Sequence, residues 1–164
     1  RLPRARLLYV ADSGHAPYGE RAADFVVERT RVLTRHLLAQ GAELIVIACN
    51  TATAAAAATL RDAHPERPFV GVEPGLKPAI ALTRNGRVGV MATRGTLASD
   101  KFRQLVAAHA QGVSLHLQAC VGLARALEGG DADSTEVQEL IALHTAPLRD
   151  AGVDTVVLGC THYP

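Results

Sequence analysis

The sequence predicts an α/β fold of two pseudo-symmetric, doubly wound domains with mostly parallel sheets and a functional cleft between them. Short apolar runs alternate with helical patterns along all 164 residues, as in parallel strands joined by right-handed crossover helices. Two runs, 41–51 and 152–162, also align without a gap. Each has a glycine, an acid two residues later, an apolar run, a small residue, a cysteine and polar side chains. Such an internal repeat predicts two similar halves.

The first domain is expected to span residues 1–73. Apolar periodicity predicts strands over 7–11, before Cys49 and over 69–72, and helices over 20–40 and 53–64. Two prolines and a glycine within 73–78 then indicate a domain boundary.

The second domain is expected to span residues 74–164. Its predicted helices cover 79–83, the segment from Ser99 through His109, 121–128 and 135–150, and its predicted strands cover 87–91, 113–117 and the run before Cys160. Ser99 is a suitable N-cap, whereas Pro147 argues locally against the last turn of the final helix. Both ends of the chain are expected to be cut, because it begins with Arg1 rather than Met and no helix follows Cys160.

Composition argues against several kinds of partner and setting. A formal net charge of +1 gives no general reason to expect nucleic acid or an anionic membrane as a partner. Polar residues interrupt the apolar ones too often for a membrane span, and no secretion signal is recognisable at the start. Three cysteines, an odd number in a chain too long to need disulfides, favour a reduced, cytoplasmic setting.

Cys49 and Cys160 occupy equivalent positions at the carboxyl ends of two predicted strands. Ligand clefts of open α/β sheets lie at such ends, and a helix amino terminus nearby can lower a thiol pKa from about 8.5 toward neutrality. Two facing acid/base groups suit the removal of a proton from one face of a carbon and its return to the opposite face, which is racemisation or epimerisation. Hydrogen-bonding neighbours support this hypothesis: Asn50 and Thr51 after the first thiol, Thr161 and His162 after the second.

Other uses of the same residues have weaker support. Cys49, Cys160, His162 and an acid could bind zinc, but the short cysteine spacing usual in structural sites is absent, so no metal is expected. A redox disulfide would leave no room for a substrate between the sulfurs. Cys120 has no matching partner and is interpreted as a buried structural thiol. Neither lysine lies in a context that marks a Schiff base, so no pyridoxal phosphate or other cofactor is expected.

Two further strand ends carry groups that could bind an anion. Backbone N–H groups around Tyr18 and Gly19 could hold a carboxylate, although Pro17-Tyr18-Gly19 taken alone is equally well interpreted as a turn that starts a helix. The hydroxyls of Thr93 and Thr96 could also bind an anion, or could cap a helix.

Several short motifs, in this order along the chain, resemble those of the cofactor-independent glutamate racemases, within the wider aspartate/glutamate racemase superfamily. They are Pro17-Tyr18-Gly19, Ala48-Cys49-Asn50-Thr51-Ala52-Thr53, Val72-Glu73-Pro74, Gly89-Val90-Met91-Ala92-Thr93 with Gly95-Thr96, Leu127-Glu128 and Gly159-Cys160-Thr161-His162-Tyr163-Pro164. The resemblance implies two similar α/β domains with the active site between them, glutamate as substrate, no cofactor, and a cytoplasmic role supplying D-glutamate for peptidoglycan. Because family members are often dimers, it also allows a homodimer.

The same resemblance implies residue roles. Cys49 matches the thiol that serves one enantiomer and Cys160 the thiol that serves the other. The positions that match the family's binding sites for the substrate carboxylate and ammonium groups are Tyr18, Gly19, Asn50, Thr51, Thr161 and His162. Glu128 and His162 match an acid and an imidazole that assist the second thiol.

Asp12-Ser13-Gly14 has the letters of the family's early Asp-Ser-Gly motif but stands in the slot of a different aspartate-containing loop. The resemblance therefore places the true motif on a strand before Arg1, and a terminal portion of the first domain after Pro164.

Two alternatives stay open: a racemase of aspartate, hydantoins or a related small acid, and a non-catalytic module that binds an amino acid or a partner protein. The Asn-Thr and Thr-His pairs after the thiols favour glutamate as the substrate. The aspartate of the family's early Asp-Ser-Gly motif is missing, and this leaves the non-catalytic binding module as an alternative.

Overall fold

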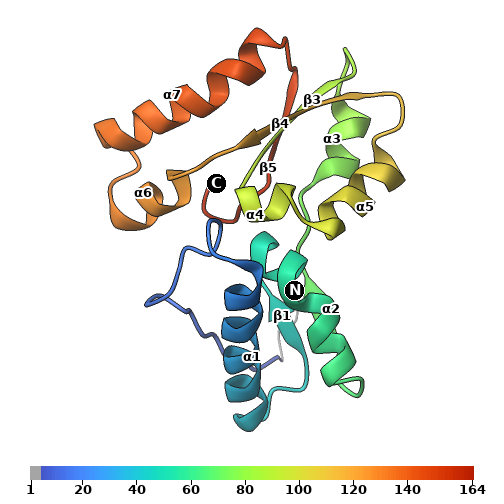
Figure 1. Cartoon of the computed structure of the whole chain (residues 1–164), viewed down its shortest axis with the longest axis vertical. Helices are drawn as coiled ribbons and strands as arrows, with labels where there is room; N and C mark the ends of the chain where they lie inside the picture. Colours follow the sequence, from blue (N-terminus) through green and yellow to red (C-terminus); the bar gives the residue numbers. More distant parts are fainter. Residues whose placement is uncertain (1–4) are drawn as a thin grey trace.

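The computed structural model describes residues 5–164, which form an α/β structure with two separate parallel sheets (Figure 1). The first sheet pairs β1 (Ile45–Ile47) with β2 (Phe69–Gly71), and the second has the order β4 (Ser114–Ala119), β3 (Arg87–Ala92), β5 (Thr155–Leu158). The helices are α1 (Ala23–Ala39), α2 (Asn50–Ala63), α3 (Leu76–Leu82), α4 (Arg94–Leu97), α5 (Asp100–His109), α6 (Leu123–Gly129) and α7 (Thr135–Asp150). The predicted α/β class with parallel strands is confirmed.

Helices α1 and α2 pack on one face of the first sheet, in the lower part of Figure 1. The buried cluster between them contains Val26, Ile45, Ile47, Leu60 and Phe69. Alternate strand residues point to the opposite face, where Val46 is 56% exposed and Val70 is 48% exposed. In the described part of the chain, therefore, helices cover this sheet on one face.

Helices cover both faces of the second sheet. Val88 and Val90 of β3 belong to a buried cluster with residues of α3 and α5. Met91 points to the other face and packs with Leu123 of α6 and Leu148 of α7. The central strand β3 is thus buried on both sides, which is the doubly wound arrangement that alternating strands and helices predict.

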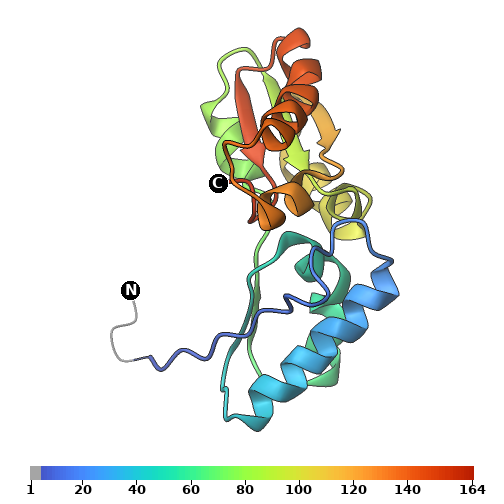
Figure 2. The ribbon, with the colours of Figure 1, turned by 90° about the vertical axis from the view of Figure 1, so that its left-hand side faces the viewer.

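The predicted strand over residues 7–11 is wrong. Figure 2 shows this segment as an irregular stretch, and none of its backbone groups pairs with a strand among the described residues. Leu7 and Tyr9 are each 87% exposed. An apolar run becomes a strand only where a neighbour supplies the hydrogen-bond ladder, and neither β1 nor β2 pairs with this one.

Four helices begin elsewhere than the sequence predicts, among them α6, which begins at Leu123 rather than at residue 121. Helix α1 begins at Ala23 rather than at residue 20, because a turn closed by the bond from Arg21 N–H to the Tyr18 carbonyl occupies the preceding residues. Helix α2 begins at Asn50 rather than at residue 53, directly after β1 and its connection. Helix α3 begins at Leu76 rather than at residue 79, with Pro78 in the first turn, where no intrahelical N–H bond is required.

The ends of the remaining helices follow from capping and solvation. Ser99 is confirmed as an N-cap, because its hydroxyl accepts from the backbone N–H of Phe102 at 3.1 Å. Helix α7 extends through Asp150 despite Pro147, so the local objection to its last turn is wrong. The carbonyl that loses its partner belongs to Leu143, which is 63% exposed and open to water.

Gly71 is expected to be essential for the packing of β2 on α2. A Cβ at residue 71 would overlap the Thr53 methyl group, and Thr53 cannot withdraw because its hydroxyl donates to the Ile47 carbonyl and accepts from Val72 N–H, both at 3.1 Å. Gly71→Ala should therefore destabilise the fold by about 1–3 kcal/mol, measured as a lower urea midpoint. Gly14→Ala, where a Cβ meets no atom within 4 Å, is the control and should leave the midpoint within error.

Candidate active site

The two cysteine motifs meet at one cavity of about 530 Å³. Cys49 lines it from the end of β1, and Thr161 and His162 line it from the segment after β5. The two segments touch directly, since the Thr161 hydroxyl lies 3.5 Å from the Ala48 carbonyl oxygen, to which it donates. The structure therefore brings the two cysteine-containing segments together, although Cys160 itself does not line the cavity.

Cys49 and Cys160 differ in their surroundings. Cys49 is half-buried, lines the cavity and is the N-cap residue of α2, as the strand-end interpretation predicts. Cys160 is 8% exposed and is not among the residues that line the cavity. A helix amino terminus can lower a thiol pKa, but no helix begins at Cys160 among the described residues, where Thr161 and His162 form a turn. Burial raises the pKa of the Cys160 thiol.

His162 joins the second thiol to a carboxylate. Its Nδ1 lies 3.6 Å from Cys160 Sγ, and its Nε2 lies 2.5 Å from Glu128 Oε1. Glu128 is carried by α6 and lines the same cavity, so α6 and the turn after β5 together position this chain of groups. With Glu128 bonded to one ring nitrogen, the other is free to exchange a proton with the thiol.

Asn50 and Thr51 lie buried in the first turn of α2 and do not line this cavity. The hydroxyl of Thr51 lies 2.9 Å from that of Thr93 and 3.2 Å from that of Thr96, and all three side chains are buried. This cluster joins α2 to α4. Thr93 also caps α4 by accepting from the backbone N–H of Thr96, so the capping interpretation is confirmed for Thr93.

The side-chain amide oxygen of Asn50 is buried without a hydrogen-bond donor among the described residues. A buried polar atom without a partner is unfavourable by about 1–3 kcal/mol, so such atoms usually have a ligand or another donor nearby. Asn50 adjoins Cys49 in the chain but lies outside the cavity that Cys49 lines.

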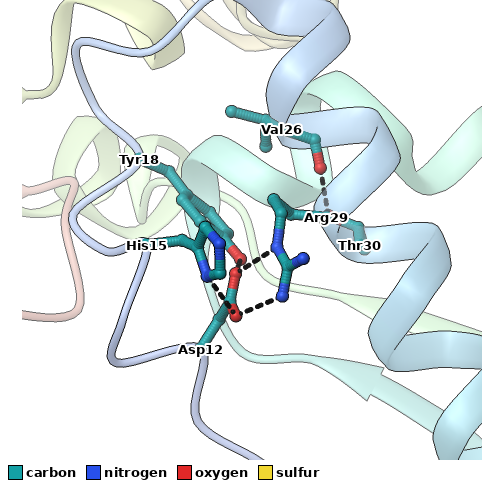
Figure 3. Close-up of polar contacts among 6 residues, drawn as sticks. All are labelled: Asp12, His15, Tyr18, Val26, Arg29 and Thr30. Atoms are coloured by element: carbon teal, nitrogen blue, oxygen red, sulfur yellow. Dashed lines mark hydrogen bonds and ion pairs between the residues drawn. The ribbon is translucent and has the colours of Figure 1, made fainter.

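Tyr18 is held by a carboxylate that is itself held by an arginine (Figure 3). The Tyr18 hydroxyl donates to Asp12 Oδ2 at 2.5 Å. Arg29 donates to the same carboxylate twice, from Nε at 2.9 Å and from an Nη at 2.7 Å, and His15 Nδ1 lies 3.1 Å from Oδ1. The hydrogen bonds from Arg29 hold the pKa of Asp12 well below its usual range, whereas burial, together with the bond to Asp12, raises the pKa of Tyr18.

Sequence reasoning missed the Asp12–Arg29 pair. It placed Asp12 correctly in the loop before Pro17-Tyr18-Gly19 but assigned it no role, and it did not consider Arg29. One signal was available: Arg29 lies three residues after the buried Val26, on the same side of α1, where an arginine needs a partner.

Gly19 lies where the first half of the chain touches the second. Its carbonyl oxygen accepts from Gly95 N–H at 3.1 Å, and a Cβ at residue 19 would lie 2.5 Å from Thr93 Cγ2. Only glycine allows this approach. One residue later, Glu20 Oε1 accepts from Gly122 N–H at 2.9 Å, which gives the loop a second contact with the other half.

Among the described residues, no group of three or more His, Cys, Asp or Glu side chains is arranged to hold a metal ion, and no helix is long and apolar enough to cross a membrane.

A family model described as Asp/Glu/Hydantoin racemase matches residues 1–164. Glutamate racemase from Ectopseudomonas mendocina is 53% identical over 99% of this chain, and that from Pseudomonas aeruginosa PAO1 is 51% identical over 100% of it. The chain spans 62% of the length of each of these relatives.

Solved structures agree with this likeness. Glutamate racemase isoform RacE1 from Bacillus anthracis superposes with a TM-score of 0.81 at 34% identity, covering 93% of this chain and 57% of that one. Escherichia coli glutamate racemase, in complex with L-glutamate and the activator UDP-MurNAc-ala, gives a TM-score of 0.73 at 34% identity, with coverage of 92% and 57%. The shared fold therefore extends through nearly all of this chain.

Proposed function

Because this chain belongs to the Asp/Glu/Hydantoin racemase family, we propose that its protein interconverts L-glutamate and D-glutamate by proton transfer at two thiols. The observation that carries the proposal is the meeting of both cysteine motifs at one cavity. Relatives named glutamate racemase, at 53% and 51% identity, support glutamate as the substrate.

In the proposed reaction, one thiolate removes the α-proton and the opposite thiol delivers a proton to the other face, which inverts the centre. Burial favours the protonated form of Cys160, so this residue is suited to act as the acid when Cys49 is the base. For the other enantiomer, His162 accepts the Cys160 proton through Nδ1, and the Glu128 carboxylate stabilises the imidazolium that forms. Acid and base both come from the chain, and no cofactor is needed.

Substrate binding is proposed for the residues that the motifs assign. Tyr18, Thr161 and His162 line the cavity beside Cys49 and can hydrogen-bond a carboxylate or an ammonium group. Gly19 brings its backbone to the junction of the two halves, and the unpartnered amide oxygen of Asn50 can accept from an ammonium group. Thr51 supports the site through its hydroxyl contacts with Thr93 and Thr96.

We further propose a boundary between domains 1–73 and 74–164. Separate buried clusters, one around β1 and β2 and two on the faces of the second sheet, support that division. By resemblance to the family, we also propose a cytoplasmic role in which the product supplies D-glutamate for peptidoglycan. A homodimer is proposed as the assembly, by resemblance to the family.

The proposed function is tested by proton NMR of L-glutamate in deuterated water, together with the change in optical rotation. The intact protein should replace the α-proton with deuterium and bring the rotation to zero. L-Aspartate, tested in parallel, should react much more slowly, since one methylene less leaves the side-chain carboxylate short of its contacts. Faster turnover of aspartate would favour the alternative racemase, and glutamate binding without deuterium incorporation would favour a binding module.

Glu128→Gln should lower racemisation by about 10–100-fold. The amide keeps the shape of the carboxylate but cannot neutralise an imidazolium at His162, and a hydrogen bond to a charged group contributes about 1.5–3 kcal/mol. The rate is measured from the optical rotation of either enantiomer. Glu136→Gln, an exposed position in the first turn of α7, is the matched control and should react at the rate of the unmodified protein.

A further inference from the structure

A second cavity, of about 230 Å³, lies at the junction of the two halves. Residues 17 and 19–21 line it from the first half, and residues near α4 and α6 line it from the second. Three arginines belong to it: Arg21, Arg94 and Arg125. We call this cavity the arginine pocket. Pro17 is the single lining residue that it shares with the cavity of Cys49, and Gly19, proposed above to help bind the substrate, lines the arginine pocket beside it.

The arginine pocket carries a net positive charge. None of its three guanidinium groups forms an ion pair with a carboxylate in the part of the chain that the structure describes. Glu20 is its single lining carboxylate, and one of its oxygens is already bonded to Gly122 N–H. Arg21 is ordered by stacking over the Phe25 ring, with 5.3 Å from Cζ to the ring centroid.

We propose that the arginine pocket binds the phosphoryl group of a small anionic metabolite. Guanidinium groups present planar, paired N–H donors that match phosphate oxygens, and several of them around one cavity attract a multiply charged anion more strongly than a single carboxylate. The volume of about 230 Å³ lies below the range of roughly 300–1,000 Å³ typical of sites for drug-sized ligands. It therefore suits a phosphate or diphosphate group.

A bound phosphoryl group would connect the two halves of the chain. Arg21 follows the loop of Tyr18 and Gly19, whereas Arg94 and Arg125 belong to α4 and α6. The same junction is already crossed by the Gly95–Gly19 and Gly122–Glu20 hydrogen bonds. The anion would reduce the repulsion among the three positively charged arginines and add hydrogen bonds between the two halves.

Pyrophosphate is the probe for this site. Calorimetric titration at about 0.15 M salt should give one saturable binding event per chain, because screening at this ionic strength suppresses weak exposed attractions. Arg94→Ala and Arg125→Ala should each raise the Kd about tenfold or more, since each removes charge-assisted hydrogen bonds. Arg125→Lys keeps the charge without the paired donors and should give an intermediate Kd.

Arg84→Ala is the matched control. Arg84 is also exposed and unpaired with a carboxylate among the described residues, but it lies before β3, at the opposite end of that strand from Arg94. It should leave the Kd unchanged. Absence of saturable binding up to millimolar pyrophosphate would overturn the proposal, as would equal weakening by Arg84→Ala. Displacement of pyrophosphate by glutamate at equal concentration would overturn the phosphoryl assignment. Racemisation is not the readout, so this result is independent of the proposed catalytic function.

Discussion

Serine in place of Cys49 or Cys160 is expected to lower glutamate racemisation by about 10²–10⁴-fold, the usual contribution of a positioned acid or base. A serine hydroxyl fits where a thiol fits, but it releases a proton far less readily and cannot act as the base. The fold should persist, because serine is a favoured N-cap at position 49 and is close to isosteric at the buried position 160. Optical rotation gives the rate, and circular dichroism monitors the fold.

Proton exchange distinguishes the two thiols. Each serine variant keeps one thiol on one face of the substrate, so it should exchange the α-proton of a single enantiomer without inverting it, and the two variants should select opposite enantiomers. Cys120→Ala is the control: Cys120 is buried against Met91 and Leu123, and burial raises the pKa of its thiol to about 11. This variant should racemise glutamate normally. Normal turnover in either serine variant would refute the assignment of two bases.

The positions of the candidate site residues along the chain could be proposed from local patterns. A glycine, an apolar run and a cysteine placed Cys49 and Cys160 at strand ends, and the repeat predicted that they meet. The strand proposed for residues 7–11 rested on an equally apolar pattern and failed, since a strand also needs a partner that no local pattern supplies.

Interactions between distant segments were harder to predict. Burial raises the pKa of Cys160, and this depends on packing by the whole fold, which no local pattern describes. Arg29 reaches Asp12 across seventeen residues, and this contact depends on how α1 turns one face toward the loop. Residue types and spacing therefore indicated a candidate site, whereas tertiary packing decides the protonation of the groups within it.

Asp12→Asn is expected to destabilise the fold by about 1.5–3 kcal/mol and to reduce kcat/KM for glutamate. The Asp12 side chain is 10% exposed and accepts hydrogen bonds from Tyr18 and twice from Arg29. An amide can accept at its oxygen alone, so it leaves the arginine incompletely paired and releases Tyr18, which is proposed to bind the substrate. Urea denaturation measures the loss of stability. Glu28→Gln, which removes an exposed carboxylate of α1, is the control and should change stability by less than about 0.5 kcal/mol.

The stability difference between Asp12→Asn and the unmodified protein should depend on pH. The pKa of Asp12 is lower in the folded chain than in the unfolded chain, where it is about 3.9. The carboxylate therefore contributes its full stability above about pH 4, and the contribution declines as the pH falls below that value toward the depressed pKa. The variant lacks this titration, so the two proteins should approach each other in stability in acid. A difference that stays constant from pH 7 down to pH 2 would mean that Asp12 acts through shape alone, and that its charge does not hold Arg29 and Tyr18 in place.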